Sequence, residues 1–362
     1  GMAGNLVNLE TNEVVKPAQV DYNGKNTVPL HAYLLQVAKV PHWVPDECLA
    51  AFPRSSDPAD ILRLQKMMDE INAAEHAPTP LDYEGKPVGI MAPPIERLKE
   101  NLADRKKLCI YDEELQNAKV VYFQMDHATK SRLLIHFYSF IFFDDWKQDL
   151  WTKRFVRDHV RYVDEVMCAA ARIISAIREI STTNGNTNGE YDAYHIRRGD
   201  FQYKKTRVEA DVIYDKSKGE VREGATVYIA TDEQDKAFFV PLAKHYKLLF
   251  LDDFIHLIPN LNTNFYGMLD QMICVKSRVF YGTWWSTFSG YINRMRGYHV
   301  AKNKWDGYQN GTLNSWYYPI PGRWDEARIY RATRKPFYMT EFPTSWLNID
   351  TGIENVYDTD TK

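Results

Sequence analysis

Apolar side chains recur at helical spacing in the first half of the chain. Between residues 154 and 180 they return every three or four positions with charges between them, which predicts one long amphipathic helix. Asp57-Pro58, a cap and a first-turn proline, predicts a helix through about Glu75. A strand is predicted at 118–123 and a helix around 133–142. The residues of the long helix predicted to pack in the core are Val156, Val160, Val163, Val166, Ala170, Ile173, Ile174 and Ile177.

Short apolar strands alternate with helical stretches in the second half. Strands are predicted at 191–196, 226–230, 248–251 and 278–281, with a helix over 233–245. This alternation is typical of right-handed crossovers and a parallel sheet covered on both faces, so we expect a Rossmann-like α/β half. The segment TTNGNTNG at 182–189 has the composition of turns and is predicted to be a hinge or linker.

Length and composition limit the class of protein. A chain of 362 residues exceeds the usual size of one core, so we expect domains at 1–181 and 190–320, and a C-terminal extension at 321–362 that packs back on the body. The net charge of -3 gives no field that would gather nucleic acid, and the longest apolar stretch, 133–143, is too short to span a membrane. Four scattered cysteines fit neither a zinc site nor a dense disulfide framework.

The strand predicted at 191–196 ends in the motif His-Ile-Arg-Arg-Gly-Asp, from His195 to Asp200. Alternation places His195 and Arg197 on one face, at the end of a parallel strand where ligands bind. A guanidinium bonds a phosphate through two parallel hydrogen bonds and stabilises the charge of a departing diphosphate, so Arg197 is the predicted catalytic residue. An ion pair between Arg197 and Asp200 is the structural alternative. We expect Arg198 to have such a structural role, and His195 to be either a core histidine or a substrate contact.

Two later segments add candidate binding residues. Asp232 follows the strand at 226–230, where it either caps the next helix or fixes the basic residues or a ribose hydroxyl. Ser286 and Thr287 stand where a helix begins, and its unpaired N–H groups favour a diphosphate. Asp270 is either an ordinary helix residue or a buried carboxylate that accepts hydrogen bonds from guanine.

These motifs together resemble the GDP-fucose-dependent fucosyltransferases, particularly the protein O-fucosyltransferases. The family signature His-x-Arg-Arg-x-Asp is met from His195 to Asp200, and Ile229–Glu233 resembles a family strand that ends in Thr-Asp. The segment from Asp270-Gln271 through Gly282-Thr283 to Ser286-Thr287-Phe288-Ser289 resembles the family's nucleotide block in order and spacing. The resemblance covers roughly 191–297.

The resemblance implies a GT-B architecture of two facing Rossmann-like domains with parallel sheets. It also implies inversion at the fucose anomeric carbon, GDP-fucose as the donor and no required metal or cofactor. Arg197 would hold the diphosphate and assist its departure, Asp270 would contact guanine, and His195 would support Arg197 or contact the nucleotide. The other residues of the predicted substrate-binding set are Arg198, Asp200, Asp232, Ser286, Thr287 and Phe288.

The function expected from this resemblance is transfer of fucose from GDP-fucose to a hydroxyl of a protein or glycan. The alternative is a catalytically inactive GDP-sugar-binding relative with a structural or partner-binding role. It stays open because the family's Gly-Gly-x-x-Asn-Gln turn has no counterpart beyond Gly4-Asn5-Leu6. The expected compartment is the ER or Golgi lumen by resemblance, or the cytoplasm, because no basic segment followed by an apolar run opens the chain.

Overall fold

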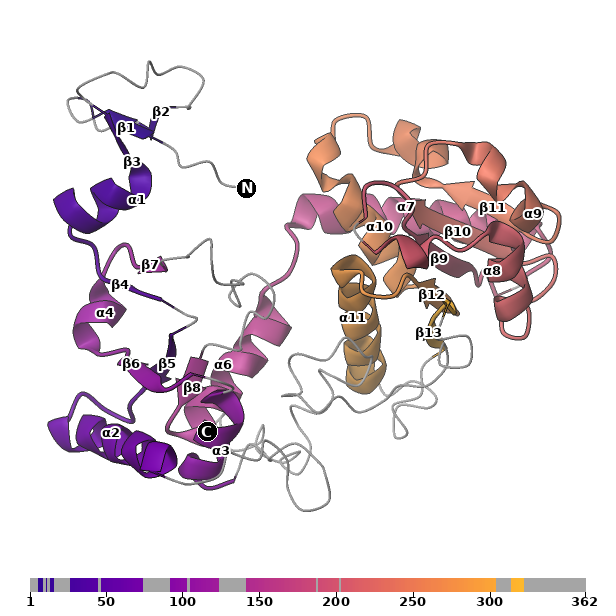
Figure 1. Cartoon of the computed structure of the whole chain (residues 1–362). Helices are drawn as coiled ribbons and strands as arrows, with labels where there is room; N and C mark the ends of the chain where they lie inside the picture. The colour runs from indigo at the N-terminus through magenta and orange to yellow at the C-terminus, as the bar shows by residue number, and fades with distance from the viewer. Residues whose placement is uncertain are drawn as a thin grey trace. The chain divides into compact units, whose positions relative to one another are not determined.

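Two compact units make up the protein (Figure 1). The computed structural model describes residues 6–8, 11, 14–15, 27–44, 47–73, 92–102, 105–123, 141–186, 188–201, 203–303 and 314–321. The division falls inside helix α6, Trp146–His159, between Thr152 and Lys153, which is earlier than the boundary predicted at 181–190. The extension predicted at 321–362 lies outside the described residues from 322 onward.

The described residues of the first unit form three small sheets. The strands are β1 (Leu6–Asn8), β2 (Val14–Val15) and β3 (Thr27–Pro29) in an antiparallel sheet, β4 (His42–Trp43) and β7 (Tyr122–Phe123) in a parallel pair, and β5 (Cys48–Phe52), β6 (Lys107–Ile110) and β8 (Ile141–Phe143) in a parallel sheet of order β6-β5-β8. Among the described residues before α6, the helical elements are α1 (Leu30–Ala32), η2 (Tyr33–Val37), α2 (Pro58–Ala73), α3 (Pro94–Leu102) and α4 (Glu113–Asn117).

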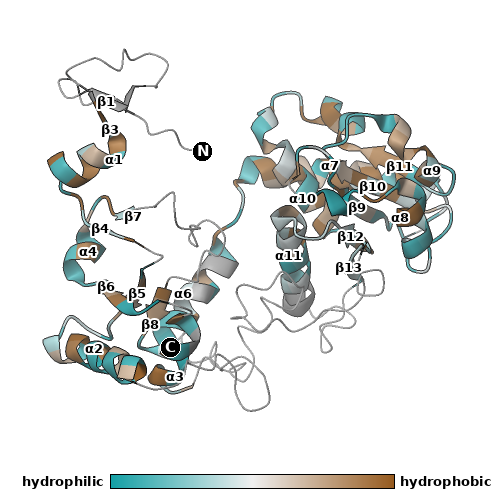
Figure 2. Ribbon diagram, in the orientation of Figure 1, coloured by the Kyte–Doolittle hydropathy of each residue, from teal (hydrophilic) through white to brown (hydrophobic). Residues whose placement is uncertain are grey.

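Helix α2 confirms the predicted helix that starts at Asp57-Pro58. The Asp57 carboxylate accepts the N–H of Ala59 at 2.8 Å, as a helix cap does. Leu64, Met68 and Ile71 return at helical spacing and are buried in a core that also contains residues of β5 and α3. Figure 2 shows the apolar residues of α2 interleaved with polar ones, the pattern of a helix with one buried face.

A disulfide joins β5 and β6 on the opposite side of the sheet from α2. Cys48 and Cys109 are bonded, and Cys109 lies directly across the ladder from Ala50, which shares a strand face with Cys48. The sequence reading did not anticipate this bridge because the two cysteines are 61 positions apart. Cys168 and Cys274 are free.

The second unit contains the parallel sheet that the sequence predicts. Its five strands run in the order β11-β10-β9-β12-β13, and every neighbouring pair is parallel. The strands are β9 (Asp192–Ile196), β10 (Thr226–Thr231), β11 (Lys247–Phe250), β12 (Phe280–Gly282) and β13 (Ser315–Tyr317). The helical elements are α7 (Asp164–Thr183), η3 (Lys204–Thr206), α8 (Ala210–Ser217), η4 (Lys236–Phe239), α9 (Val240–Ala243), η5 (Leu251–Leu257), η6 (Thr263–Phe265), α10 (Tyr266–Val275) and α11 (Thr287–Asn303).

Each face of this sheet has its own core. Because strand side chains alternate, Ala193 and Tyr228 enter one core with residues of α7, α10 and α11. Tyr194 and Ile229 enter the other core, with residues of α8 and of the segment around α9. His195 and Arg197 follow the alternation of Ala193, so they lie on the side of α7, α10 and α11. Figure 1 shows α10 and α11 beside β9 and β12.

The predicted helix over 154–180 is in fact two helices. Helix α6 ends at His159 and α7 begins at Asp164, and the residues between them are not helical. Core packing was predicted for Val160 and Val163, and this is wrong, because they are 59% and 58% exposed. The same prediction is correct for the members that lie in α7: Val166, Ala170, Ile173 and Ile177 are buried and Ile174 packs partly buried against them.

Three other predicted elements are shorter or different. The strand predicted at 118–123 is limited to β7, and the helix over 233–245 is reduced to η4 and α9, because Pro241 at the start of α9 lacks the N–H that a longer helix needs. The helix predicted around 133–142 lies outside the described residues except at its end, which belongs to strand β8.

The Asn- and Gly-rich segment after α7 is part of the folded second unit. The Asn184 side chain donates to the carbonyl of Gly224 at 2.9 Å and to the hydroxyl of Thr226 at 3.2 Å, which ties the end of α7 to the start of β10. Gly185 has a φ of 96°, which only glycine adopts easily, and so ends the helix. The prediction that this segment is a hinge or linker is therefore wrong.

Candidate functional site

The candidate site lies at the point where the strand order of the second unit reverses. From β9 the chain moves to β10 and β11 on one side and returns to β12 and β13 on the other. Beyond the carboxyl ends of the strands at such a switch point, the two crossovers part and leave room for a ligand. Arg197 directly follows β9, and Thr283 directly follows β12.

Thr283 ties these two strand ends together. Its hydroxyl is fully buried, donates to the carbonyl of His195 at 2.8 Å and accepts the backbone N–H of Arg197 at 3.1 Å. Since this single proton is used for His195, the hydroxyl of Tyr318, 2.5 Å away, is the donor of the remaining bond. The sequence reading assigned no role to Thr283 or Tyr318. Thr283 stood inside the recognised nucleotide block, whereas no local pattern marks Tyr318.

His195 is both buried and next to the candidate site. It is 6% exposed, its ring stacks on Phe288 with centroids 4.5 Å apart, and Nδ1 shares a hydrogen bond of 2.7 Å with the hydroxyl of Ser289. Burial lowers the pKa of His195 to about 3, since desolvation outweighs the attraction of Asp232, and Arg197 lowers it further. The ring is therefore neutral at physiological pH and serves as a hydrogen-bonding and stacking group.

A tight turn delivers the start of α11 to the same place. The backbone N–H of Ser286 donates to the carbonyl of Thr283 at 3.3 Å, and Trp285 has a φ of 58°, the sign that the third residue of a type II turn requires. Gly282 allows the close approach, because a Cβ there would lie 2.7 Å from Oγ and 2.8 Å from Cβ of Ser289. The helix thus opens with Ser286 buried and Thr287 exposed, beside the end of β12.

The guanidinium of Arg197 is held by two carboxylates. One terminal nitrogen donates to Asp200 at 3.1 Å, and Nε lies 3.5 Å from a carboxylate oxygen of Asp232. The pairing with Asp200 that the sequence offered as a structural alternative therefore occurs, although the Asp200 side chain is 94% exposed. Within the described part of the chain, Nε of Arg197 is buried and has no hydrogen-bond partner.

Arg198 points to a different set of partners, as the sequence reading expected. Its guanidinium donates to Glu233 and to the carbonyl of Val208, both at 3.1 Å, and lies 3.8 Å from the centroid of the Phe238 ring. Its backbone N–H donates to Asp232 at 2.7 Å. These contacts are those of the structural role, and Asp232 bridges the two arginines.

Asp270 approaches the site from helix α10. The carboxylate is half-buried and accepts a hydrogen bond of 2.6 Å from the fully buried hydroxyl of Tyr228, which the sequence reading did not single out. Burial raises the pKa of Asp270 to about 7. One helical turn earlier, Gly267 faces Phe288, because a Cβ there would lie 3.5 Å from its ring. This face of α10 therefore borders the aromatic ring that stacks on His195.

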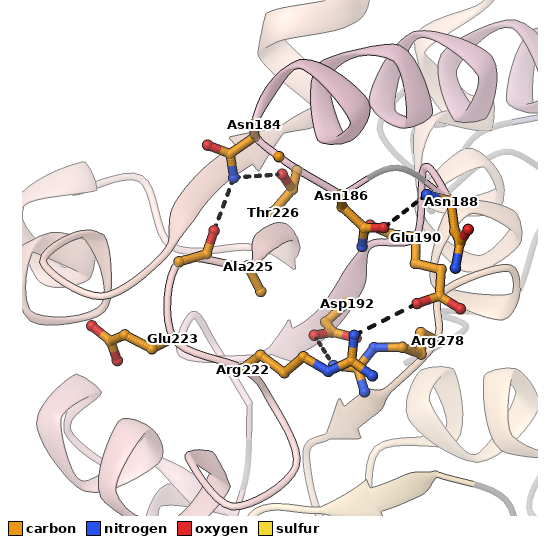
Figure 3. A pocket seen from close by; sticks show the side chains of 12 residues that line it. Asn184, Asn186, Asn188, Glu190, Asp192, Arg222, Glu223, Ala225, Thr226 and Arg278 are labelled. Atoms are coloured by element: carbon orange, nitrogen blue, oxygen red, sulfur yellow. Dashed lines mark hydrogen bonds and ion pairs between the residues drawn. The ribbon is translucent and has the colours of Figure 1, made fainter.

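A polar pocket of about 350 Å³ lies at the opposite end of the sheet (Figure 3). It is lined by residues at the amino ends of the strands, among them Asp192, the first residue of β9, and Thr226, the first of β10. Asp192 is buried and pairs with Arg278 at 2.6 Å, and Asn184 bonds Thr226, so these polar groups satisfy one another. The sequence-predicted site residues do not line this pocket.

Within the described residues, no three His, Cys, Asp or Glu side chains cluster closely enough to bind a metal ion. Among the same residues, no helix has the length and apolar character that crossing a membrane requires.

Comparison with known proteins identifies the family of the chain. No curated protein matches the sequence significantly. The family model described as GDP-fucose protein O-fucosyltransferase matches residues 64–299, a range that includes the whole site from His195 to Phe288. That family implies transfer of fucose from a GDP-fucose donor to a protein acceptor. Since the match extends over well more than half of the sequence and agrees with the motifs at the strand ends, the chain belongs to the GDP-fucose protein O-fucosyltransferase family.

Proposed function

We propose that the protein is an inverting fucosyltransferase that moves fucose from GDP-fucose to a hydroxyl of a protein, with Arg197 as its catalytic residue. One observation carries the proposal: the hydroxyl of Thr283 bonds the backbone of Arg197 and stands in the turn that opens α11. A guanidinium and a helix start, two groups that bind phosphate oxygens, therefore meet at the switch point of the sheet.

The reaction fits these groups. The acceptor oxygen attacks the anomeric carbon, the bond from that carbon to the diphosphate breaks, and GDP leaves with the bonding electrons while a general base takes the acceptor proton. Negative charge grows on the diphosphate in this step. Arg197 and the first-turn N–H groups of α11 stabilise that charge more strongly in the transition state than in the bound donor.

The ion pairs of Arg197 suit this role. Asp200 is almost fully exposed, so a diphosphate can replace it at low cost, and Nε of Arg197 lacks a hydrogen-bond partner among the described residues. Asp232 is also bonded to the backbone of Arg198, which holds it in place to orient the guanidinium. Phe288 and the exposed hydroxyl of Thr287 would then face the phosphate and the sugar.

We further propose a GT-B arrangement, with the second unit as the donor side and the first unit as the acceptor side. The five-stranded parallel sheet of the second unit supports the first assignment, and the parallel sheet β6-β5-β8 of the first unit is consistent with the second. We expect no metal requirement, because Arg197 and the helix start supply the positive charge that a metal ion supplies in other transferases.

A catalytically inactive GDP-sugar-binding protein is the second candidate. The observation in its favour is the missing Gly-Gly-x-x-Asn-Gln turn of the family. The two candidates share donor binding and differ in turnover. Release of GDP from GDP-fucose, in water or with acceptor proteins, therefore separates them.

The test combines calorimetry and turnover. The wild-type protein is expected to bind GDP in calorimetric titration in preference to UDP, and to release GDP from GDP-fucose. Arg197→Ala is expected to lower turnover by about 100-fold or more, because it removes a group that acts on the departing diphosphate. Retention of more than about a tenth of the rate would contradict the role of Arg197.

Arg222→Ala is the matched control. Arg222 belongs to the same unit but lies at the amino end of the sheet, where it pairs with Glu190 at 3.9 Å and is largely exposed. Its removal is expected to leave turnover unchanged. A folded wild-type protein that binds no GDP at low or high salt would refute the proposed function.

A further inference from the structure

Tyr228 is a buried phenol whose hydroxyl bonds a carboxylate of the candidate site. It lies in the middle of β10, has no exposed surface, and its hydroxyl donates to Asp270 at 2.6 Å. A phenol bonded to a carboxylate forms a charge-assisted hydrogen bond, which is stronger than one between neutral groups. The fold has therefore placed a donor at the one oxygen of Asp270 that faces the sheet.

Alternation along β10 explains this placement. Tyr228 shares a face with Ala230, on the side of the sheet covered by α7, α10 and α11. Asp270 comes from α10 on that side, one oxygen of its carboxylate accepts from Tyr228, and the residue is half-buried. Its second oxygen is thus available to a ligand that enters from the end of the sheet where Phe288 lies.

Among the described residues, two charged side chains influence the pKa of Asp270. Asp252 in η5 raises its pKa, Lys236 in η4 lowers it, and these two form their own ion pair at 3.4 Å. Cys274, one turn later in α10, is buried, and its thiol has a pKa well above the usual range, so it stays neutral. The two larger influences oppose each other: burial raises the pKa of Asp270, and the bond from Tyr228 lowers it.

We infer that Tyr228 is a positioning residue that holds Asp270 ionised and oriented to accept the N–H groups of the donor's guanine. This inference rests on the proposed function and on the expectation from the family resemblance that Asp270 contacts guanine. A carboxylate accepts from both the ring N–H and the amino group of guanine, whereas a protonated carboxyl offers a donor at one of these positions and loses that match. Donor binding should therefore weaken as the pH falls through neutrality and Asp270 takes up a proton. The hydrogen bond from Tyr228 lowers the pH at which this happens.

Tyr228→Phe tests the inference in calorimetric titrations with GDP-fucose from pH 6 to pH 8.5. GDP-fucose is the suitable probe because its diphosphate is esterified at both ends and has no proton to lose near neutrality. Affinity of the wild type is expected to fall below a midpoint near the Asp270 pKa of about 7. In Tyr228→Phe that midpoint is expected to move up by about one pH unit, with about fivefold weaker binding at pH 7 that is mostly recovered at pH 8.5.

Tyr194→Phe is the matched control. Tyr194 is an equally buried tyrosine on the neighbouring strand β9, and its hydroxyl lies 2.6 Å from that of Ser217 on the opposite face of the sheet. The Tyr194→Phe variant loses a buried hydrogen bond of the same length as Tyr228→Phe does. A general loss of stability would therefore affect both variants. Its midpoint for GDP-fucose binding is expected to equal that of the wild type.

Asp270→Asn keeps the inference testable if Tyr228→Phe does not fold. Asparagine does not titrate, so the pH dependence of GDP-fucose binding between pH 6 and 8.5 is expected to disappear. An unshifted midpoint in folded Tyr228→Phe, or a wild-type pH dependence in Asp270→Asn, would overturn the inference while donor binding itself stands. A wild-type protein that binds no GDP-fucose at any pH would instead refute the proposed function.

Discussion

His195 should make the second unit less stable in mild acid, by an amount that follows from its burial. The unfolded chain takes up a proton on this histidine below its ordinary pKa of 6.5, whereas the folded protein does not until about pH 3. Each pH unit between these values costs about 1.4 kcal/mol of folding free energy. Between pH 8 and pH 5 the loss from His195 is therefore about 2 kcal/mol.

The wild type alone cannot reveal this loss, because Asp270 has the opposite effect. Its pKa is raised from 3.8 to about 7, so the folded protein holds a proton that the unfolded chain has released, and acid stabilises the fold by a similar amount over the same range. The difference between the wild type and His195→Asn isolates the histidine. Asparagine places an amide near the position of Nδ1, which retains a partner for Ser289, and it does not titrate.

The assay is urea unfolding at pH 8 and pH 5. Unfolding is monitored by hydrogen exchange and mass spectrometry of the peptide that contains β9. This readout reports the second unit even if the two units unfold separately. Replacing the ring removes its stacking on Phe288, so the variant should be less stable at pH 8. Between pH 8 and pH 5, the free energy of unfolding of the variant should fall by about 2 kcal/mol less than that of the wild type. Equal pH dependence of the two proteins would refute the claim that His195 stays neutral when folded.

Three further substitutions have expected outcomes. Gly282→Ala forces a methyl group within 2.8 Å of Ser289 Cβ, so it should lower the free energy of unfolding by about 1–3 kcal/mol; an unchanged melting temperature would show that α11 shifts freely. Arg198→Ala should cost about 1.5–3 kcal/mol of stability yet reduce turnover far less than the loss of Arg197, which melting curves and steady-state rates on folded protein will check. Cys109→Ser opens a loop of 61 residues and should cost about 4 kcal/mol; a reductant should destabilise the wild type equally and leave the variant unaffected.

Four strands of the second unit's sheet, β9 to β12, were predictable from the sequence because each is a short apolar run, whereas β13 was not predicted. The parallel order and the positions of Arg197 and Asp232 at strand ends follow from that pattern. Local pattern also predicted that Arg198 points away from Arg197, because consecutive residues of a strand point to opposite faces.

What the pattern did not predict depends on contacts between distant residues. Tyr318 and Tyr228 are ordinary apolar positions in the sequence, and only the fold brings their hydroxyls to Thr283 and Asp270. The long helix was predicted to continue through Val160 because the apolar residues keep their helical spacing there. Tertiary structure nevertheless breaks the helix between α6 and α7.

The bridge between Cys48 and Cys109 has a consequence for how the protein is made. Bonds of this kind form and persist in oxidising compartments and are rare where glutathione and thioredoxin keep thiols reduced. The bridge joins two neighbouring strands of the sheet β6-β5-β8. Production in a reducing cytosol should therefore yield a protein whose first unit is less stable. Secretion into the periplasm or the ER should instead supply the oxidant that this sheet needs, and the second unit, with Cys168 and Cys274 free, should tolerate either environment.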